Sequence, residues 1–291
     1  MNNKFAIIGG DLRLVKLAQI LQKENNLIYV FGLEKSKELG NYSNIKINKD
    51  LVQTLENTEI IISSIPFSRD KQTINMPLSD NKIKIDELMN LIKDKTLIAG
   101  TISNDIYEKY KDVKIIDIMK NEKLAILNTI ATAEGAIKEI IENTQINIHG
   151  SKIMILGFGR IGKTLAKKLD GLSAKVTVVS KEDEELAWAE AYGYINIELN
   201  KIKNIIKDYD IIVNTIPSII LQGSILKEIN KNVLLLDLAS GDGGINKKEA
   251  DENNLNLIKS LGIPGKISPI ATAKILKEAI YEIMEEKKEC L

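Results

Sequence analysis

The segment that most constrains this chain is a glycine-rich turn between an apolar run and an amphipathic stretch. Residues 152–156 are predicted as a strand and residues 160–170 as a helix, with Gly157, Gly159 and Gly162 at the junction. In this spacing the first glycine makes a tight turn, the second lets a pyrophosphate approach the backbone, and the third lets the helix pack closely. The helix start also directs N–H groups and its positive dipole end toward phosphates. The turn therefore predicts a dinucleotide-binding site, with Arg160 and Ile161 beside the pyrophosphate.

The end of the next predicted strand, residues 175–179, distinguishes the two nicotinamide cofactors. A site for NAD usually has Asp or Glu there, which holds the 2′-hydroxyl of the ribose. This chain has Ser180 and Lys181 instead, and a hydroxyl and an ammonium group attract the 2′-phosphate of NADP. Glu182 and Asp183 follow, and we expect them to turn outward. The pattern favours NADP and leaves NAD open as the alternative.

Short apolar runs alternate with amphipathic segments through both halves of the chain, which predicts an α/β fold with parallel sheets. We interpret the pattern as two Rossmann-like, doubly wound parallel-sheet domains. The predicted strands are 4–8, 27–31, 44–47, 59–63, 96–99 and 113–117, then 152–156, 175–179, 194–197, 210–214, 233–238 and 255–258. The predicted helices are 12–24, 84–92 and 104–110, then 160–170, 182–191, 199–207, 222–229 and 246–253.

Two further apolar periodicities predict long bridging helices, at 131–145 and at 270–287. We expect an N-terminal substrate-side domain over 1–128, to which the C-terminal helix within 269–291 packs back. A linker helix over 129–147 and a dinucleotide-binding domain over 148–268 follow, with a cleft between the two domains. Residues 66–81 are long and polar enough for a mobile loop over a site.

Three loops at the carboxyl ends of the predicted strands of the second sheet are candidates for contacts with a dinucleotide, because ligands bind at that edge. The loop 214–218 is expected near the nicotinamide ribose. The loop 237–241 is expected near the nicotinamide amide, and the loop 262–266 leads to another helix start. The predicted contact residues are Thr215, Ile216, Pro217, Asp237, Ser240 and Pro264.

The charge balance and the scarcity of metal-binding residues exclude several classes of function. Lys and Arg number 40, as do Asp and Glu, so no bulk field favours nucleic acid or an anionic membrane. No apolar run approaches the roughly 20 residues that span a bilayer. Cys290 is the only cysteine, so no intrachain disulfide and no cysteine-based metal site can form, and a cytoplasmic location is the default. His149, the only histidine, is expected at a surface or hinge.

The order of short motifs along the chain resembles that of the dipicolinate synthase A subunit family, whose members occur in spore-forming bacteria. The individual motifs are short, but their order covers nearly the whole length. They are Gly9-Gly10-Asp11 with Arg13, 100–104, 128–135, 148–151, the glycine turn, 214–218, 237–240, and 262–265 followed by Pro269 and Thr272. The chain departs from the family pattern at Ser268, where alanine is expected, and at 241–244, where a basic residue and a proline are expected.

The resemblance implies oxidation of dihydrodipicolinate to dipicolinate with NADP in the mother-cell cytoplasm of a sporulating bacterium. It also implies a flavoprotein partner, the dipicolinate synthase B subunit, and we leave a homodimer open. A ring dicarboxylate needs fixed cations, and arginine grips a carboxylate with two parallel hydrogen bonds. Arg13 and Arg69 are therefore expected to bind the carboxylates, with Arg160 facing either the pyrophosphate or the substrate. Three hydroxyl residues are expected to help bind the substrate: Ser103, Thr132 and Ser268.

Two carboxylates are candidates for the base that removes the ring proton, Glu134 and Asp11. Each has an alternative role, since Glu134 could be an exposed or capping residue and Asp11 could cap the first helix. Two alternative functions also stay open. One is a non-catalytic cofactor-binding or regulatory component of a heteromeric complex. The other is a different two-domain NAD(P)-dependent dehydrogenase of amino or keto acids.

Overall fold

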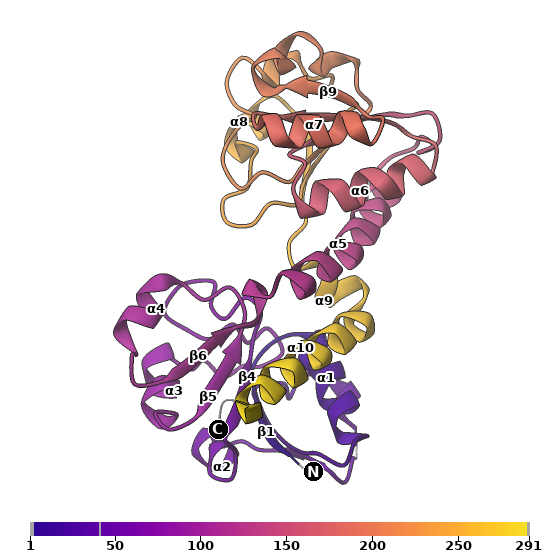
Figure 1. The fold of residues 1–291 in the computed structure, drawn as a ribbon. Coiled ribbons are helices and arrows are strands. Elements are labelled where there is room, and N and C mark those ends of the chain that lie inside the picture. The colour runs from indigo at the N-terminus through magenta and orange to yellow at the C-terminus, as the bar shows by residue number, and fades with distance from the viewer. Residues whose placement is uncertain (1–2, 41, 290–291) are drawn as a thin grey trace. The chain divides into compact units, whose positions relative to one another are not determined.

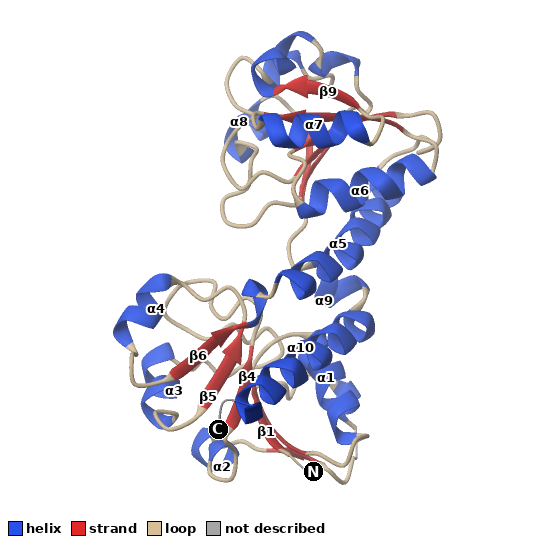
Figure 2. Ribbon diagram, viewed as in Figure 1, coloured by secondary structure: helices blue, strands red, loops and turns tan. Residues whose placement is uncertain are grey.

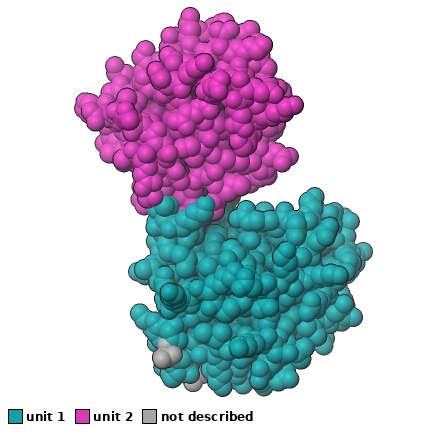
Figure 3. Space-filling model, turned by 180° about the vertical axis from the view of Figure 1, so that it is seen from behind, with its two compact units in different colours: residues 1–128, 264–291 teal, residues 129–263 magenta. Residues whose placement is uncertain are grey.

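The computed structural model describes residues 3–40 and 42–289. The chain divides into two compact units (Figure 3). Unit 1 comprises Met1–Asn128 and Pro264–Leu291, and unit 2 comprises Thr129–Ile263. Unit 1 is thus built from two stretches of chain, and unit 2 is continuous. Cys290 lies outside the described residues.

Unit 1 contains a six-stranded sheet in which all neighbouring strands are parallel (Figure 1). The strand order is β3-β2-β1-β4-β5-β6, which is the doubly wound order of dinucleotide-binding folds. Each strand begins and ends within one residue of its predicted bounds. The strands are β1 (Lys4–Ile8), β2 (Leu27–Phe31), β3 (Ile45–Ile47), β4 (Ile60–Ser63), β5 (Thr96–Ala99) and β6 (Lys114–Asp117).

Both faces of this sheet are covered by helices, as a parallel sheet requires. Alternate residues of β1 enter different cores: Phe5 and Ile7 pack with one cluster, and Ala6 and Ile8 with the other. The first cluster includes the apolar faces of α1 (Leu12–Gln22) and α10 (Pro269–Glu289). The second lies under α2 (Leu51–Leu55), α3 (Ile85–Leu91) and α4 (Asn104–Lys109). All four of these β1 side chains are fully buried.

Unit 2 repeats the same strand order in its own six-stranded parallel sheet, β12-β11-β10-β7-β8-β9 (Figure 2). The prediction of two Rossmann-like parallel sheets is therefore confirmed. The strands are β7 (Lys152–Leu156), β8 (Lys175–Ser180), β9 (Ile195–Glu198), β10 (Ile211–Asn214), β11 (Leu234–Asp237) and β12 (Asn256–Lys259). The helices include α6 (Arg160–Gly171), α7 (Asp183–Ala191), α8 (Lys247–Glu252) and α9 (Ile263–Ile267).

The helix predicted at 131–145 begins much earlier, because α5 spans Glu122–Asn143. Asn121 caps its start: its side-chain Oδ1 accepts from the N–H of Leu124 at 2.9 Å. Leu124 and Ala125 are buried, so the extra turns have an apolar face of their own. The sequence underestimates this helix because the segment before residue 131 also carries exposed apolar residues, such as Ile126 and Ile130, that blur the pattern.

Two other predicted helices are wrong in type, and two short α-helices were missed: α2, and α9, which forms where the loop 262–266 was predicted. Residues 199–207 form the 3₁₀ segments Leu199–Asn204 and Ile206–Asp208, and only Leu226–Glu228 within 222–229 is helical, again as 3₁₀. The missed helix α2 follows Asp50, whose side chain accepts from the N–H of Gln53.

The loop at 66–81 is fastened to the body of unit 1. Phe67 and Ile74 are buried, and the backbone N–H of Phe67 donates to the carbonyl of Gly100 at 2.7 Å. The Asp70 carboxylate accepts hydrogen bonds from the N–H groups of Gln72 and Thr73. The loop therefore has a fixed internal shape that positions Arg69.

Candidate functional site

The glycine turn joins β7 to α6 at the carboxyl edge of the unit 2 sheet. Gly157 has a φ of 88°, a left-handed conformation that favours glycine. A Cβ there would lie 2.7 Å from Thr215 Oγ1 and 2.8 Å from a carbon of Ile216. A Cβ at Gly162 would lie 2.2 Å from the carbonyl oxygen of Gly157. The first and third glycines are therefore required by close approach inside the protein.

The second glycine differs, because the space beside it is open. A Cβ at Gly159 would meet only one atom within 4 Å, the Glu185 Oε1 at 3.7 Å. Gly159 is the N-cap residue of α6 and has no side chain to cap the helix. The first N–H groups of an α-helix lack intrahelical partners and attract anions. Arg160 and Ile161 begin α6 at this end, so the cradle fits the pyrophosphate of a dinucleotide.

The loop after β10 packs directly on the glycine turn. The Thr215 hydroxyl donates to the carbonyl oxygen of Leu156 at 2.8 Å, and its backbone N–H donates to the same oxygen at 2.9 Å. Thr215 thus holds the end of β7 in place. Ile216 lies over Gly157, and Pro217 is exposed at the tip of the loop.

Asp237 organises the loop after β11 through its buried carboxylate. It accepts from Asn214 Nδ2 at 2.8 Å and from the backbone N–H groups of Ala239 and Gly244. A Cβ at Gly243 would lie 2.1 Å from Asp237 Oδ2, so no side chain fits there. Asp237 is 1% exposed, and its oxygens are satisfied by the loop. Ser240 is exposed on the same loop.

The end of β8, where Ser180 and Lys181 were predicted to favour NADP, is in contact with the carboxylate of Glu185. The Ser180 hydroxyl donates to Glu185 Oε2 at 2.6 Å, and Ser180 is 1% exposed. Lys181 is exposed and lies 3.4 Å from a Glu182 carboxylate oxygen. Glu185, in the first turn of α7, is a residue that sequence reasoning missed. The sequence signal for Glu185 was weak, because this residue comes five positions after the end of the strand and is one of several consecutive acidic residues.

In unit 1, Asp11 and Arg13 form an ion pair where β1 meets α1. Arg13 Nη2 lies 2.7 Å from Asp11 Oδ2, Nε donates to Oδ1 at 2.9 Å, and Nη2 also donates to the carbonyl of Ile65. Asp11 also caps α1 by accepting from the Arg13 backbone N–H. Arg13 is 5% exposed, so this guanidinium is both buried and oriented.

Loops after four neighbouring strands of unit 1 are linked at the same edge. Arg13 reaches the loop after β4 through Ile65, and Phe67 of that loop bonds Gly100 after β5. Asp117, at the end of β6, accepts from the N–H groups of Thr101 and Ile102. The hydrogen bonds fix these loops relative to one another. The predicted substrate residues Arg69 and Ser103 belong to them.

Arg69 is exposed, and within the described residues its guanidinium makes no hydrogen bond or ion pair. Ser103 precedes α4, where its hydroxyl does not cap the helix. Ser268 lies at the start of α10, and its backbone carbonyl accepts from the N–H of Thr272. Pro264 is in α9, which also contains Gly265. A Cβ at Gly265 would lie 2.5 Å from Asp11 Oδ2, so the backbone of α9 contacts the Asp11–Arg13 pair.

Glu134 and Thr132 lie on α5 and not at the edge of a sheet. Glu134 Oε1 accepts from Lys168 Nζ of α6 at 2.9 Å, and the Glu134 side chain is half exposed. It does not cap the helix, because α5 begins twelve residues earlier, at Glu122. Thr132 is buried, as is Thr129 one turn before it, whose hydroxyl lies 2.7 Å from that of Thr164.

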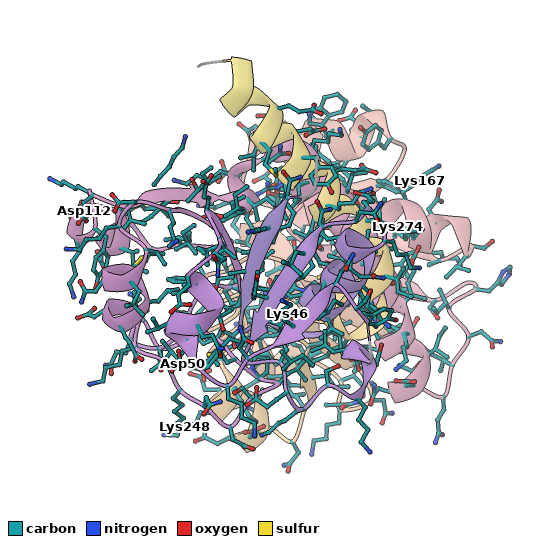
Figure 4. All side chains as sticks on the ribbon, turned by 90° about the horizontal axis from the view of Figure 1, so that it is seen from below. Lys46, Asp50, Asp112, Lys167, Lys248 and Lys274 are labelled. Carbon is teal, nitrogen blue, oxygen red and sulfur yellow. The ribbon has the colours of Figure 1, made fainter. Side chains whose placement is uncertain are left out.

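The surface carries charged side chains of both signs, among them Lys46, Asp112 and Lys248 (Figure 4). No helix in the described part of the chain has the length and apolar character needed to cross a bilayer. Among the residues that the structure describes, no group of three His, Cys, Asp or Glu side chains could hold a metal ion.

The fold and the glycine cradle define a protein with an NAD(P)-binding, dehydrogenase-like domain. Family comparison agrees: residues 123–243 match the D-isomer specific 2-hydroxyacid dehydrogenase, NAD binding domain, and residues 4–120 match the N-terminal domain of the dipicolinate synthase A subunit. The chain is 30% identical to the dipicolinate synthase A subunit of Bacillus subtilis (strain 168) over 97% of its own length and 96% of the relative's. It therefore belongs to the dipicolinate synthase A subunit family, as the motif order predicted.

Solved structures of that family match the chain over nearly its whole length. The dipicolinate synthase A chain from Bacillus subtilis has a TM-score of 0.84 at 27% identity, covering 100% of this chain and 98% of that one. The dipicolinate synthase A subunit from Bacillus halodurans has a TM-score of 0.83 at 25% identity, covering 97% of each chain.

Proposed function

We propose that this chain is a dipicolinate synthase A subunit that oxidises dihydrodipicolinate to dipicolinate. The observation that carries the proposal is the full-length relationship to the Bacillus subtilis protein of that name, which spans both units. The proposal places the protein in the mother-cell cytoplasm of a sporulating bacterium, with the flavoprotein B subunit as its partner. The reaction removes a hydride and a proton from the ring, and aromatisation supplies much of the driving force.

The dinucleotide is assigned to the cradle in unit 2. Gly157 and Gly162 shape the turn, Gly159 leaves room for the pyrophosphate, and the start of α6 stabilises its charge. When bound, the nicotinamide supplies the acceptor for the hydride. NADP, predicted from Ser180 and Lys181, and NAD differ in the 2′ substituent of the adenosine ribose. The choice between them therefore depends on the residues around Ser180.

The two substrate carboxylates are assigned to the edge of unit 1. Asp11 and the Ile65 carbonyl hold Arg13 through Nε and Nη2, while Nη1 makes no hydrogen bond within the described residues. That arrangement supports Arg13 as an oriented cation for one carboxylate, with Asp11 as its positioning residue. Arg69 is proposed for the other carboxylate, and Ser103, Thr132 and Ser268 remain proposed hydrogen-bond partners of the substrate.

Both candidates for the base are already engaged in ion pairs. Asp11 would have to release Arg13, and Glu134 would have to release Lys168, before either could take the ring proton. Glu134 is the more accessible of the two, because its ion pair is half exposed and exposed pairs contribute little stability. We therefore keep Glu134 as the proposed base and assign Asp11 to positioning.

The test is an assay of the full chain with dihydrodipicolinate and each dinucleotide, following absorbance of the reduced nicotinamide with and without the B subunit. The proposal expects dinucleotide reduction that depends on dihydrodipicolinate. Reduction of the dinucleotide by amino acids, or oxidation of the reduced dinucleotide by keto acids, would indicate a different dehydrogenase and overturn the proposal.

A second candidate is a cofactor-binding component whose partner carries out the chemistry. The engagement of both candidate bases in ion pairs favours it. The same assay separates the two functions, because this candidate expects dinucleotide binding without reduction unless the partner is present.

A further inference from the structure

The carboxylate of Glu185 is anchored against the glycine turn by two hydrogen bonds to one of its oxygens. Oε2 accepts from the backbone N–H of Phe158 at 2.7 Å and from the hydroxyl of Ser180 at 2.6 Å. Phe158 is the residue between the first two glycines, and Ser180 ends the neighbouring strand β8. The carboxylate therefore spans the junction of β7 and β8, where the adenosine ribose binds in folds of this kind.

The other oxygen of Glu185 is left facing the open side of the turn. Oε1 accepts no hydrogen bond within the described residues, and it lies 3.7 Å from the Cβ position of Gly159. Of the three glycines in the turn, Gly159 is the one whose Cβ position has no other atom within 4 Å. Oε1 is thus an oriented acceptor beside the space that the cradle reserves for a ligand.

Aromatic packing between the glycine turn and the end of α7 holds Glu185 close to the turn. Phe158 is fully buried and makes edge-to-face contacts with Tyr192 and Tyr194, at ring-centre distances of 6.2 and 6.0 Å. Tyr192 directly follows α7, so these contacts hold the helix against the turn. The first turn of α7, which carries Glu185, is consequently held at the ribose position.

Ser180 and Lys181, the two residues expected to bind a 2′-phosphate, already have partners within the protein. The Ser180 hydroxyl already donates to Glu185 and accepts from the N–H of Glu182. Lys181 is 70% exposed and pairs with Glu182. A phosphate at the ribose 2′ position would meet the Glu185 carboxylate, and two like charges in a partly buried site repel strongly.

We propose that Glu185 makes this chain prefer NAD to NADP. Oε1 accepts a hydrogen bond from the 2′-hydroxyl of the adenosine ribose and repels a 2′-phosphate, which is the role that an acidic residue at the strand end has in other NAD sites. In this chain the carboxylate comes from the following helix, five residues further on. The inference rests on the proposed function for the dinucleotide site itself, and reverses the preference predicted from Ser180 and Lys181.

The test is titration calorimetry of the full chain with NAD and with NADP. The unaltered chain is expected to bind NAD about tenfold or more tightly than NADP, the factor expected for one charged hydrogen bond gained or one repulsion avoided. Glu185→Gln retains an oxygen for Phe158 but loses the charge, so the ratio of the two dissociation constants should fall about tenfold or more.

Two matched variants control for general effects. Glu184→Gln removes an exposed neighbouring charge that makes no hydrogen bond to the turn, and should leave the ratio within about twofold, as for surface charges. Lys181→Ala tests the opposite interpretation, which requires a loss of NADP affinity alone. The melting temperature of each variant shows whether it remains folded.

Tighter binding of NADP by the unaltered chain overturns the inference, as does an unchanged ratio in Glu185→Gln. A selective loss of NADP affinity in Lys181→Ala does the same. Failure of the unaltered chain to bind either dinucleotide would instead overturn the proposed function. The two failures are therefore distinguishable in one set of titrations.

Discussion

Arg13 lies at the start of α1 with its guanidinium held on two sides. Asp11 accepts two of its N–H groups, and the Ile65 carbonyl accepts another, from the loop after β4. Arg13 is buried and the Asp11 side chain is 26% exposed, and a charge pair taken out of water is costly unless hydrogen bonds satisfy it. The pair fits the proposed role of Arg13 in binding a substrate carboxylate, with Asp11 as its positioning residue.

Arg13→Lys should weaken substrate binding without affecting the dinucleotide. The three donors of lysine lie on one nitrogen, so it lacks the planar fork with which Arg13 holds Asp11 and Ile65 and still presents Nη1 to a carboxylate. We expect KM for dihydrodipicolinate to rise about tenfold or more, for the loss of one charge-assisted contact. The dissociation constant for the dinucleotide should remain unchanged, which makes calorimetry the internal control. Full catalytic efficiency in both Arg13→Lys and Arg69→Lys would remove the arginines from the substrate site.

Gly162→Ala should damage the cradle, whereas Gly171→Ala in the same helix should not. The new Cβ at Gly162 would lie 2.2 Å from a backbone oxygen, so α6 must move away from β7. We expect a lower melting temperature and a dinucleotide dissociation constant raised about tenfold or more. A Cβ at Gly171 meets nothing within 4 Å, and alanine in a helix is better than glycine by about 0.5–1 kcal/mol. Equal behaviour of the two variants would contradict the assigned role of Gly162.

Some of the site was predictable residue by residue, and some was not. The spacing of Gly157, Gly159 and Gly162 follows from mechanical needs that any such turn has, so a local pattern suffices. Glu185 was missed because its contacts depend on how a helix turns back over a strand end, which no short motif encodes. The partners of Asp237 were missed for a related reason, since Asn214 comes from a neighbouring strand.

Among the elements, the twelve strands were predictable and several connections were not. Parallel strands buried on both faces appear as continuous apolar runs, such as 59–63 and 233–238, whose ends are marked by polar residues. Helices on the outside need only one apolar stripe, and a stripe of two residues fits a 3₁₀ turn as well as an α-turn. Ile202 and Ile206, both buried, have the spacing of an α-helix but lie in two 3₁₀ segments.

Tyr281 joins α10 to the end of α1, and Tyr281→Phe should destabilise unit 1. Its hydroxyl accepts from Asn26 Nδ2 at 3.0 Å and donates to Glu24 Oε2 at 2.6 Å. We expect the free energy of unfolding at pH 7 to fall by about 1 kcal/mol, the usual net value of a hydrogen bond. Tyr192→Phe is a control, because that side chain is 54% exposed and its hydroxyl makes no hydrogen bond within the described residues.

The effect of Tyr281→Phe should also depend on pH. Burial, together with the hydrogen bond to Glu24, raises the pKa of Tyr281 from 10.0 to about 12. A pKa raised on folding means that the stabilisation is fully present below pH 10 and is lost as the pH rises toward 12. Urea unfolding of both proteins should therefore show a constant difference from about pH 7 to 9 that shrinks above about pH 10. A difference that grows above that pH would contradict the assigned sign.

At the scale of the whole molecule, two units share one strand order but have different turns after their first strands. In unit 1, the N–H of Gly10 donates to the carbonyl of Asn75 at 3.1 Å, and a Cβ at Gly9 would lie 2.5 Å from Met76 Cγ. The 66–81 loop thus covers the place that corresponds to the proposed pyrophosphate site of unit 2. Gly9-Gly10-Asp11 lacks the spacing of the three glycines in unit 2, but the sequence does not show what fills this turn, because Gly9 and Met76 are far apart in the chain.

The chain should accordingly bind one dinucleotide, and Gly157→Val should abolish that binding. A Cβ at Gly157 collides with Thr215 and Ile216, and its left-handed backbone disfavours a branched residue. Calorimetry of the unaltered chain is expected to give a stoichiometry of one per chain. A stoichiometry of two, or dinucleotide binding retained in the variant, would show that unit 1 also binds.

The division of unit 1 between two stretches of chain has a consequence for synthesis on the ribosome. α10 supplies Ala273, Leu276 and Ile280 to the core that covers α1, yet it is translated after every strand of unit 2. Unit 2 is complete as a nascent chain while α1 still lacks its cover. We expect its apolar face, with Leu14 and Leu17, to stay uncovered until α10 emerges. We therefore expect unit 2 to complete its core before unit 1, although most of unit 1 is translated first.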